Sequence, residues 1–508
     1  MESRLNPTVG NPAQTHKLKD QTMKFVFFFP LTNKDNKHKV SPPLSLLALA
    51  APLLKEGVEV EIVDARVEPD YEAKVLGLME DADLFGVSSM TGYQISDGLK
   101  VSAAVKKMFP EKPVVWGGYH PSLMAQQTIL DENIDLAVRG QGEETCVELA
   151  RWLAGEIKLG DIPGLTMKVD GTVVHNPERK VADINVFPAM PYDLVDVERY
   201  IEFNSRFHGD TRRAVSYVSS FGCPHACGFC SNPEAYGRKW KGLEAGRVVA
   251  EVTGLVERYD LERFYFDDNN FFASKRRVRE ICKGFKAAPR SFEWFATIRP
   301  TQVMAFDDED LQLIRDSGCT KFMMGAESGD NAILELINKG NEAGDVLEAT
   351  RRCRAHNIQP SYVFIFGFPT ETWAQMQTTL DFMKQLKEIY ADTRTTTLFF
   401  TPYPGTALTQ LGEKSGFNLP DTLADWAVYD ARSVQTPWIS RKQKTRVKQI
   451  ADFYLPWAYP NQLAREKVAR SKVKPVYWLF SQACKLRVGL GFYSLPWEWK
   501  LARWLKLT

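Results

Sequence analysis

Three cysteines lie within eight residues of one another in the segment GCPHACGFCSNP. Cys223, Cys227 and Cys230 follow a predicted strand, and the neighbouring glycines and proline favour a turning chain. Thiolates at spacings of four and three residues converge well on an iron-sulfur cluster. A 4Fe-4S cluster has four irons, so three cysteines leave one iron open to another ligand. The motif therefore predicts a cluster with an exchangeable position.

Two simpler interpretations compete with this one. A tetrahedral zinc site could use the three cysteines and His225, because Cys3His sites are common in proteins. Alternatively, the three cysteines could share a loop by chance. The other five cysteines stand alone among apolar neighbours, at positions 146, 282, 319, 353 and 484. This distribution indicates a reducing compartment and one metal site, not a disulfide framework.

Composition and charge describe a folded protein of several domains. The 508 residues are 44% hydrophobic and 25% charged, and a chain of this length normally forms two or three domains. The formal net charge is only +1, so no chain-wide field attracts nucleic acid, and we expect no nucleic-acid partner.

The N-terminal residues carry no targeting signal that we recognise. Residues 1–22 are polar and lack the apolar region of a signal peptide, so we expect a flexible tail. The apolar run 25–31 is far shorter than the roughly 20 residues needed to span a bilayer. We therefore expect a cytoplasmic protein.

The order of predicted elements gives an α/β fold in two main parts. In residues 23–154, short apolar strands alternate with helices, which is typical of a doubly wound parallel sheet. The predicted strands are 24–29, 58–64, 84–89, 113–118 and 135–140. Ligands of such sheets bind beyond the carboxyl ends of the strands.

A second α/β series follows a connector over residues 155–210, which contains one hairpin with Asp170 and Gly171 at its turn. In residues 211–410, six strands are predicted at 214–220, 263–268, 292–298, 321–327, 361–367 and 395–401. Six strand and helix units predict a partial (β/α)6 barrel instead of the complete eight-unit barrel. Residues 411–508 are predicted to form a helical C-terminal extension.

The cysteine motif and its place after a strand resemble the radical S-adenosylmethionine (SAM) superfamily, which also has an aromatic residue before the last cysteine, as Phe229 is here. Over roughly residues 23–410, the chain is similar to the branch with a cobalamin-binding domain. That branch includes radical methylases and the anaerobic magnesium-protoporphyrin ester cyclase. The resemblance implies a 4Fe-4S cluster, SAM and cobalamin as cofactors, a small-molecule substrate, and an electron donor such as flavodoxin or ferredoxin.

The same resemblance implies which residues bind SAM. The predicted strand ends carry FDDNN, TIRP, GAESGD and FGFPTET at the barrel mouth. By resemblance, Asp267, Asp268 and Asn269 would lie near the SAM amino group, and Arg299 could pair with its carboxylate. Glu327 and Ser328 would approach the ribose, and Glu371 with the backbone near Gly367 would support the adenine. Each of these residues could instead cap a helix or bridge acids.

In the N-terminal domain the family pattern is only partly present. The Asp-x-His-x-x-Gly loop that supplies a lower cobalt ligand is replaced by LTNKDNKHKVS, in which Asp35 and His38 have a different spacing. Small residues do occur at the expected strand ends, namely Ser88, Ser89, Gly117 and Gly118, where a nucleotide tail could approach the backbone. His120 could touch the corrin or its tail, or form an ordinary hydrogen bond. The domain could also be a vestigial fold that binds nothing.

These features predict an enzyme that cleaves SAM reductively and functionalises an unactivated carbon, most readily by methyl transfer through cobalamin. Oxidative cyclisation or oxygen insertion is the alternative within the branch, and a sensor without turnover is the alternative outside it.

The C-terminal extension ends in a basic, tryptophan-rich segment. From Arg465 to Thr508 there are ten Lys or Arg and two Glu. A terminal helix would place Trp497, Leu501, Trp504 and Leu505 on one face, which suits peripheral contact with a membrane. The same face could instead pack on the barrel.

Overall fold

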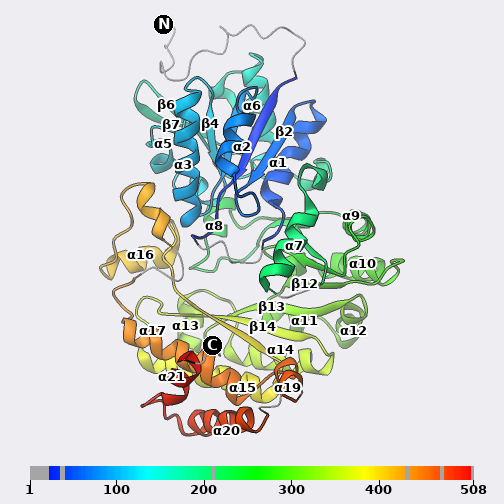
Figure 1. Ribbon diagram of the computed structural model, residues 1–508, viewed down its shortest axis with the longest axis vertical. Helices are drawn as coiled ribbons and strands as arrows, with labels where there is room; N and C mark the ends of the chain where they lie inside the picture. Colours follow the sequence, from blue (N-terminus) through cyan, green and yellow to red (C-terminus); the bar gives the residue numbers. More distant parts are fainter. Residues whose placement is uncertain (1–21, 35–39, 209–211, 430–434, 470–473, 505–508) are drawn as a thin grey trace.

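The computed structural model describes residues 22–34, 40–208, 212–429, 435–469 and 474–504. Asp35, His38 and the proposed flexible tail before residue 22 lie outside these residues. Two sheets follow one another along the chain, and the C-terminal helices gather at the end of the molecule opposite the N-terminal sheet (Figure 1). The predicted α/β class, with a partial barrel and a helical C-terminus, is confirmed.

The N-terminal sheet has seven strands in the order β2-β1-β3-β4-β5-β6-β7. Its strands are β1 (Lys24–Phe29), β2 (Glu59–Asp64), β3 (Leu84–Ser88), β4 (Val114–Gly117), β5 (Leu136–Val138), β6 (Leu165–Val169) and β7 (Thr172–His175). The first five pair in parallel, in the 2-1-3-4-5 order of a doubly wound fold. Strand β1, KFVFFF, is apolar on both faces because helices cover both sides of the sheet.

The helices that cover this sheet form in the segments between the strands, where the sequence predicts helices. They are α1 (Leu44–Lys55), α2 (Tyr71–Leu78), α3 (Tyr93–Met108), α4 (Tyr119–Leu123), α5 (Ala125–Ile129) and α6 (Glu143–Leu153). Helix α1 ends just before Gly57, whose φ of 81° is the left-handed conformation that favours glycine.

The predicted connector contributes to this sheet. Its hairpin forms β6 and β7, with Asp170 and Gly171 both at positive φ in the turn, and β6 pairs antiparallel with β5. Helix α7 (Val197–His208) then contacts the N-terminal domain, since the Tyr200 hydroxyl donates to the Asp64 carboxylate over 2.8 Å.

The second sheet has six parallel strands in the order β15-β14-β13-β12-β11-β8. They are β8 (Ala214–Tyr217), β11 (Arg263–Phe266), β12 (Glu293–Thr297), β13 (Cys319–Glu327), β14 (Gln359–Phe366) and β15 (Arg394–Phe399). A separate hairpin of β9 (Ser220–Gly222) and β10 (Trp240–Gly242) flanks the cysteine segment together with α8 (Asn232–Tyr236). All six strands of the predicted barrel are therefore present.

A layer of helices covers the outside of this partial barrel. It consists of α9 (Ala245–Arg258), α10 (Lys275–Lys286), α11 (Pro300–Ala305), α12 (Asp308–Asp316), α13 (Asn331–Leu336), α14 (Ala343–Ala355) and α15 (Trp373–Ile389).

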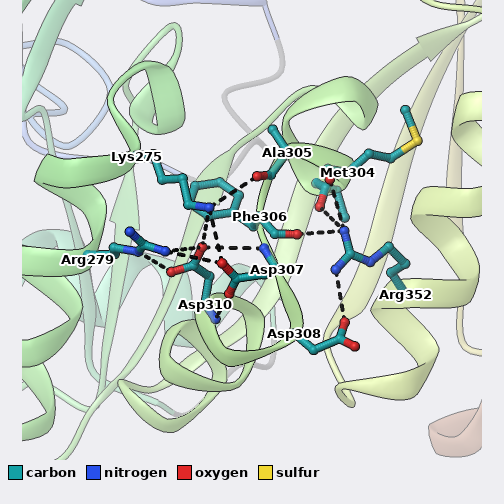
Figure 2. A network of polar contacts seen from close by, with 10 residues as sticks. Lys275, Arg279, Met304, Ala305, Phe306, Asp307, Asp308, Asp310 and Arg352 are labelled. Atoms are coloured by element: carbon teal, nitrogen blue, oxygen red, sulfur yellow. Dashed lines mark hydrogen bonds and ion pairs between the residues drawn. The ribbon is translucent and has the colours of Figure 1, made fainter.

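A polar network ties four of these helices together (Figure 2). Lys275 and Arg279 of α10 form ion pairs with Asp310 of α12, whose side chain is almost fully buried. Arg352 of α14 donates to the Phe306 carbonyl over 2.7 Å and also to the last carbonyls of α11. Those carbonyls have no partner within their own helix, so Arg352 satisfies them.

The C-terminal extension packs on both domains. It contains α16 (Ala407–Lys414), η6 (Ala424–Val428), α17 (Arg441–Lys448), η7 (Gln449–Tyr454), α18 (Leu455–Ala458), α19 (Gln462–Ala469), α20 (Lys474–Leu490) and α21 (Trp497–Trp504). Element η6 lies against α3, and the Trp426 indole donates to Gln127 over 2.6 Å. Among the residues that the structure describes, no helix is both long and apolar enough to cross a membrane.

Candidate cofactor site between the two domains

The cysteine segment leaves β9 through Gly222, whose φ of 78° is left-handed and whose missing side chain leaves room for the Lys239 carbonyl. Backbone hydrogen bonds then fix the loop on two sides. The Gly228 N–H donates to the Ile337 carbonyl over 2.8 Å, and the Leu408 N–H donates to the Gly228 carbonyl over 3.0 Å. The loop is therefore held by segments far away in the sequence.

The three loop cysteines differ in exposure from the other five. Cys223, Cys227 and Cys230 are partly exposed, whereas the remaining cysteines are buried. The Arg299 guanidinium donates to the Cys227 sulfur over 3.4 Å, and the Asn270 amide lies 3.9 Å from the Cys223 sulfur. The loop sulfurs thus have polar neighbours from the ends of other strands of the barrel. Within the described ranges, no three His, Cys, Asp or Glu side chains are already close enough together to hold a single metal ion.

The three residues predicted at the end of β11 are used differently. Asp267 and Asn269 line the large cavity described below. Asp268 is buried, and its carboxylate accepts hydrogen bonds from the Ser219 N–H over 3.0 Å and the Ser219 hydroxyl over 2.8 Å, and another from Ser220. Asp268 thus positions the strand end that leads into the cysteine loop and does not line the cavity.

Glu327 ends β13 in a strained conformation, with φ of 61°. Its carboxylate forms a buried ion pair with Lys339 over 2.6 Å, and the Lys339 ammonium lies 5.7 Å from the ring centre of Phe229 in the cysteine loop. Ser328 is fully buried and its hydroxyl lies 2.9 Å from that of Thr379, so it holds the loop after β13. Sequence reasoning did not identify Lys339, because a lysine twelve residues beyond Glu327 has no recognisable spacing.

Glu371 organises the loop after β14. Its carboxylate accepts from the Gly367 N–H over 2.5 Å and the Phe368 N–H over 3.1 Å, while its second oxygen has no hydrogen-bond partner in the described part of the chain. Burial raises the pKa of Glu371 to about 7, although the two N–H groups favour the ionised form. The Gly367 carbonyl accepts from the Trp438 indole over 2.6 Å, so the C-terminal extension also supports this loop.

A cavity of about 580 Å³ lies between the two domains. Alternate residues of β1 and β3 line it, together with α1 and α6, so it extends between one face of the N-terminal sheet and its helices. From the barrel side it is lined by Ser220, Phe221, Asp267 and Asn269. The carboxyl ends of both sheets therefore open onto one cavity.

Four predicted residues of the N-terminal domain line this cavity or support its wall. Ser88, Ser89, Gly117 and Gly118 all border it. A methyl group added to Gly118 would lie 2.7 Å from the Ser89 carbonyl oxygen, so these two strand ends approach each other closely. A methyl group added to Gly117 would meet only the Val138 side chain, at 3.7 Å, which leaves the space in front of Gly117 open.

His120, the histidine predicted for the cobalamin site or for an ordinary hydrogen bond, lies in helix α4. Its ring is fully buried, 5.4 Å from the Trp426 ring centre, with Nδ1 2.9 Å from the Thr91 hydroxyl. It does not border the cavity. Burial lowers the pKa of His120 to about 3, so the ring is neutral at ordinary pH. The structure thus places His120 within α4, among buried side chains and outside the lining of the cavity.

Tyr119, the neighbour of His120, is a site residue that the sequence did not reveal. Its hydroxyl accepts from the Asn269 amide over 3.3 Å and lies 3.4 Å from the Asn232 oxygen. Its ring packs edge to face on Tyr236 at 5.1 Å. One side chain of the N-terminal domain therefore joins the flank of the cysteine loop to the end of β11.

The donor set and the cavity fit the cofactors that the sequence predicts. Three accessible thiols beside a guanidinium suit an iron-sulfur cluster. The deep slot between the sheet and α1, lined by apolar rings and small residues, suits a flat organic group.

Comparison with known families agrees with this arrangement. The profile of the radical SAM superfamily matches residues 217–383, so the chain belongs to that superfamily. The profile of the B12-binding domain matches residues 36–150, and the chain is therefore a B12-binding radical SAM enzyme, as the sequence predicted. These families imply a 4Fe-4S cluster, SAM and cobalamin.

Individual relatives share most of the chain at low identity. An uncharacterised methyltransferase of Pyrococcus horikoshii is 29% identical over 395 residues, which are 76% of this chain and 83% of the relative. An anaerobic magnesium-protoporphyrin IX monomethyl ester cyclase of Synechocystis is 25% identical over 374 residues, 72% of each protein. The solved structure of the cobalamin-dependent SAM radical enzyme OxsB superposes with a TM-score of 0.73 at 16% identity, over 99% of this chain and 81% of OxsB. The last comparison shows a common fold.

Proposed function

We propose that this enzyme transfers a methyl group to an unactivated carbon of a small molecule, with cobalamin as the methyl carrier. The observation that carries the proposal is the shared cavity, because Ser88 and Gly117 line it from one domain and Asp267 and Asn269 from the other. A methyl carrier and a radical source must both reach one substrate carbon, and a common cavity permits this. Two bacteriochlorophyllide methyltransferases and a cytidylyl-2-hydroxyethylphosphonate methyltransferase among the relatives support the same reaction.

In this class of enzyme the cluster and SAM supply hydrogen-atom abstraction, and cobalamin supplies the methyl group. Cys223, Cys227 and Cys230 would hold the cluster. Arg299 beside Cys227 gives the surroundings of the loop positive charge, which suits the carboxylate of SAM. Lys339 lies beside Phe229, but its charge is offset by the ion pair with Glu327. Glu371 fixes the backbone at Gly367, where a planar base could pack.

The electron needed for SAM cleavage must come from outside the chain, and we propose a flavodoxin or ferredoxin as the donor.

Cyclase relatives make non-methylating chemistry the second candidate. The two reactions differ in the fate of the SAM methyl group. We therefore propose an anaerobic assay of the reconstituted protein with cobalamin, a chemical reductant, methyl-deuterated SAM and a metabolite extract from a strain lacking the gene. A metabolite that gains the intact labelled methyl group supports methyl transfer. Formation of 5'-deoxyadenosine together with an unlabelled, oxidised product would support cyclisation and overturn methyl transfer.

A further inference from the structure

The C-terminal helices expose an unusual amount of apolar surface. Nine of the seventeen large apolar side chains that are exposed in the described residues lie within positions 476–501. Scattered apolar side chains on a surface are normal, but a concentration in one short segment is typical of an interaction site. Helix α20, which carries much of this surface, lies at the end of the molecule farthest from the N-terminal sheet (Figure 1).

Helix α20 has two apolar faces, and only one of them packs on the protein. The inward face is fixed by aromatic contacts, such as Trp457 stacked on Tyr477 at 5.5 Å, and by the fully buried Cys484. The outward face carries Val476, Leu479, Leu486 and Leu490, each 61–70% exposed. Spacings of three, seven and four residues put these four side chains in one stripe along the helix.

The apolar surface continues past the end of the helix. Phe492 and Leu495 are 50% and 78% exposed in the turn after α20, and Trp497 is 54% exposed at the start of α21. The turn is held rigidly, because Arg487 donates to the carbonyls of Ser494 and Leu495 over 3.0 and 3.1 Å. We call the outward stripe of α20 together with these three residues the apolar tip.

The charge within the segment that forms the apolar tip is almost entirely positive. Residues 474–504 contain a single acid, Glu498, and it is 1% exposed and paired with Arg487. Lys485 and Lys500 are exposed beside the tip. Helix α17, RKQKTRVK, adds five Lys or Arg and no acid, and its Arg446 donates to the Tyr493 carbonyl within the turn.

We propose that the apolar tip binds the surface of an anionic lipid bilayer, with the leucines and Trp497 in the acyl boundary and the surrounding lysines at the headgroups. Apolar side chains rimmed by basic ones are typical of helices that lie in the membrane interface. A second copy of the chain is a poorer occupant, because two tips brought together would oppose basic residues to basic residues. The proposal concerns attachment and does not depend on the reaction that the enzyme catalyses.

Flotation of the full-length protein with liposomes tests the proposal. We expect the protein to float with vesicles of phosphatidylcholine and phosphatidylglycerol, to float less with pure phosphatidylcholine, and to be released as salt screens the lysines. Replacing Leu486 and Leu490 with Ser should lower the partition coefficient about tenfold, since two apolar side chains are lost from the interface. Replacing Lys485 and Lys500 with Glu should abolish the preference for anionic vesicles.

The matched control changes two equally exposed apolar residues elsewhere. Leu130 and Met108 of the N-terminal domain are 60% and 56% exposed, and replacing both with Ser should leave flotation unchanged. Thermal unfolding should be similar for all variants, because exposed substitutions change stability little. Equal flotation of the Leu486→Ser/Leu490→Ser variant and the control would overturn the proposal. So would a wild-type dimer in sedimentation velocity that the same variant dissociates, because the tip would then bind a second copy.

Discussion

The two sides of the central cavity are built on different principles. The N-terminal side offers space, since glycines and serines end β3 and β4, and a methyl group added to Gly117 would meet a single side chain. The barrel side holds charged groups in place around the cysteine loop, as in the Glu327–Lys339 pair and the Arg299 contact with Cys227, although none of these four residues lines the cavity itself. Space accepts a large, mostly apolar group with few polar contacts, whereas fixed charges position a small zwitterion. Cofactor binding on the N-terminal side should therefore be lost when a larger side chain fills the space. Cofactor binding on the barrel side should be lost when a particular side chain is removed.

The sharpest test on the barrel side removes one thiol. Cys223→Ala, Cys227→Ala or Cys230→Ala should each lower 5'-deoxyadenosine formation at least about 1000-fold, because a cluster that lacks a thiolate ligand is not held for catalysis. The wild-type protein should be brown and bind about four irons per chain after anaerobic reconstitution.

Cys282→Ala is the matched control for the thiol variants. Cys282 is fully buried in α10, and burial raises the pKa of its thiol to about 12, so it is not a metal ligand in the folded protein. This variant should retain SAM cleavage. Stoichiometric zinc without iron in the wild-type protein would contradict the assignment of the cysteine loop.

The matching test on the N-terminal side fills the space. Gly117→Phe should weaken cobalamin binding about 100-fold, because the ring would extend from the strand end into the cavity. Iron content should stay unchanged, since Gly117 lies on the other domain. Gly117→Ala, whose methyl group fits against Val138, serves as the control and should bind cobalamin nearly as well as the wild type. Absorbance of bound cobalamin per chain gives both values, and equal binding by the Phe variant would remove cobalamin from this cavity.

His120 belongs to the N-terminal domain but does not line the cavity, so it should not affect the bound cobalt. His120→Ala should leave the electron paramagnetic resonance spectrum of the Co(II) protein unchanged, with no nitrogen splitting from a protein ligand in either form. It should lower the free energy of unfolding by about 3 kcal/mol, because a buried ring packed on Trp426 is lost. A nitrogen splitting that His120→Ala or His38→Ala removes would identify a lower cobalt ligand.

The fold could be predicted from the sequence because its strands are short apolar runs separated by turn residues. All eleven strands predicted for the two sheets form, and even the hairpin at Asp170 and Gly171 was recognisable from its turn chemistry. The pairing of this hairpin with β5 could not be predicted, because the alternation of apolar and polar residues in a short hairpin does not specify a partner strand.

The candidate site was predictable only where chemistry is concentrated in sequence. The cysteine motif is local, so its spacing is informative. Lys339, Tyr119 and Trp438 reach the site from distant segments, through a buried ion pair, an interdomain hydrogen bond and an indole contact. Asp268 and Ser328 are themselves predicted site residues, yet their carboxylate and hydroxyl groups form hydrogen bonds with neighbouring loops. Position after a strand thus did not distinguish groups that face the cavity, such as Asp267 and Asn269, from groups that support neighbouring loops.

The last prediction concerns the buried carboxyl of Glu371 on the barrel side. Its pKa is about 7 in the folded protein, above the usual value of 4.5, because burial disfavours the carboxylate more than two N–H donors favour it. A raised pKa means that the folded state binds the proton more tightly, so this contribution to stability is present below pH 4.5 and is lost as the pH rises through 7. The loss should be about 3 kcal/mol, since each pKa unit corresponds to about 1.4 kcal/mol. Glu371→Gln stays neutral at every pH. The free energy of unfolding of the wild type, relative to that of this variant, should therefore fall as the pH rises across this window.

Asp310→Asn is the control. Its difference from the wild type in unfolding free energy should be constant over the same range, because the ion pairs of Asp310 lower the pKa of that carboxyl below 3.8. Urea unfolding at several pH values measures both, and a pH-independent difference for Glu371→Gln would show that the buried carboxyl remains ionised.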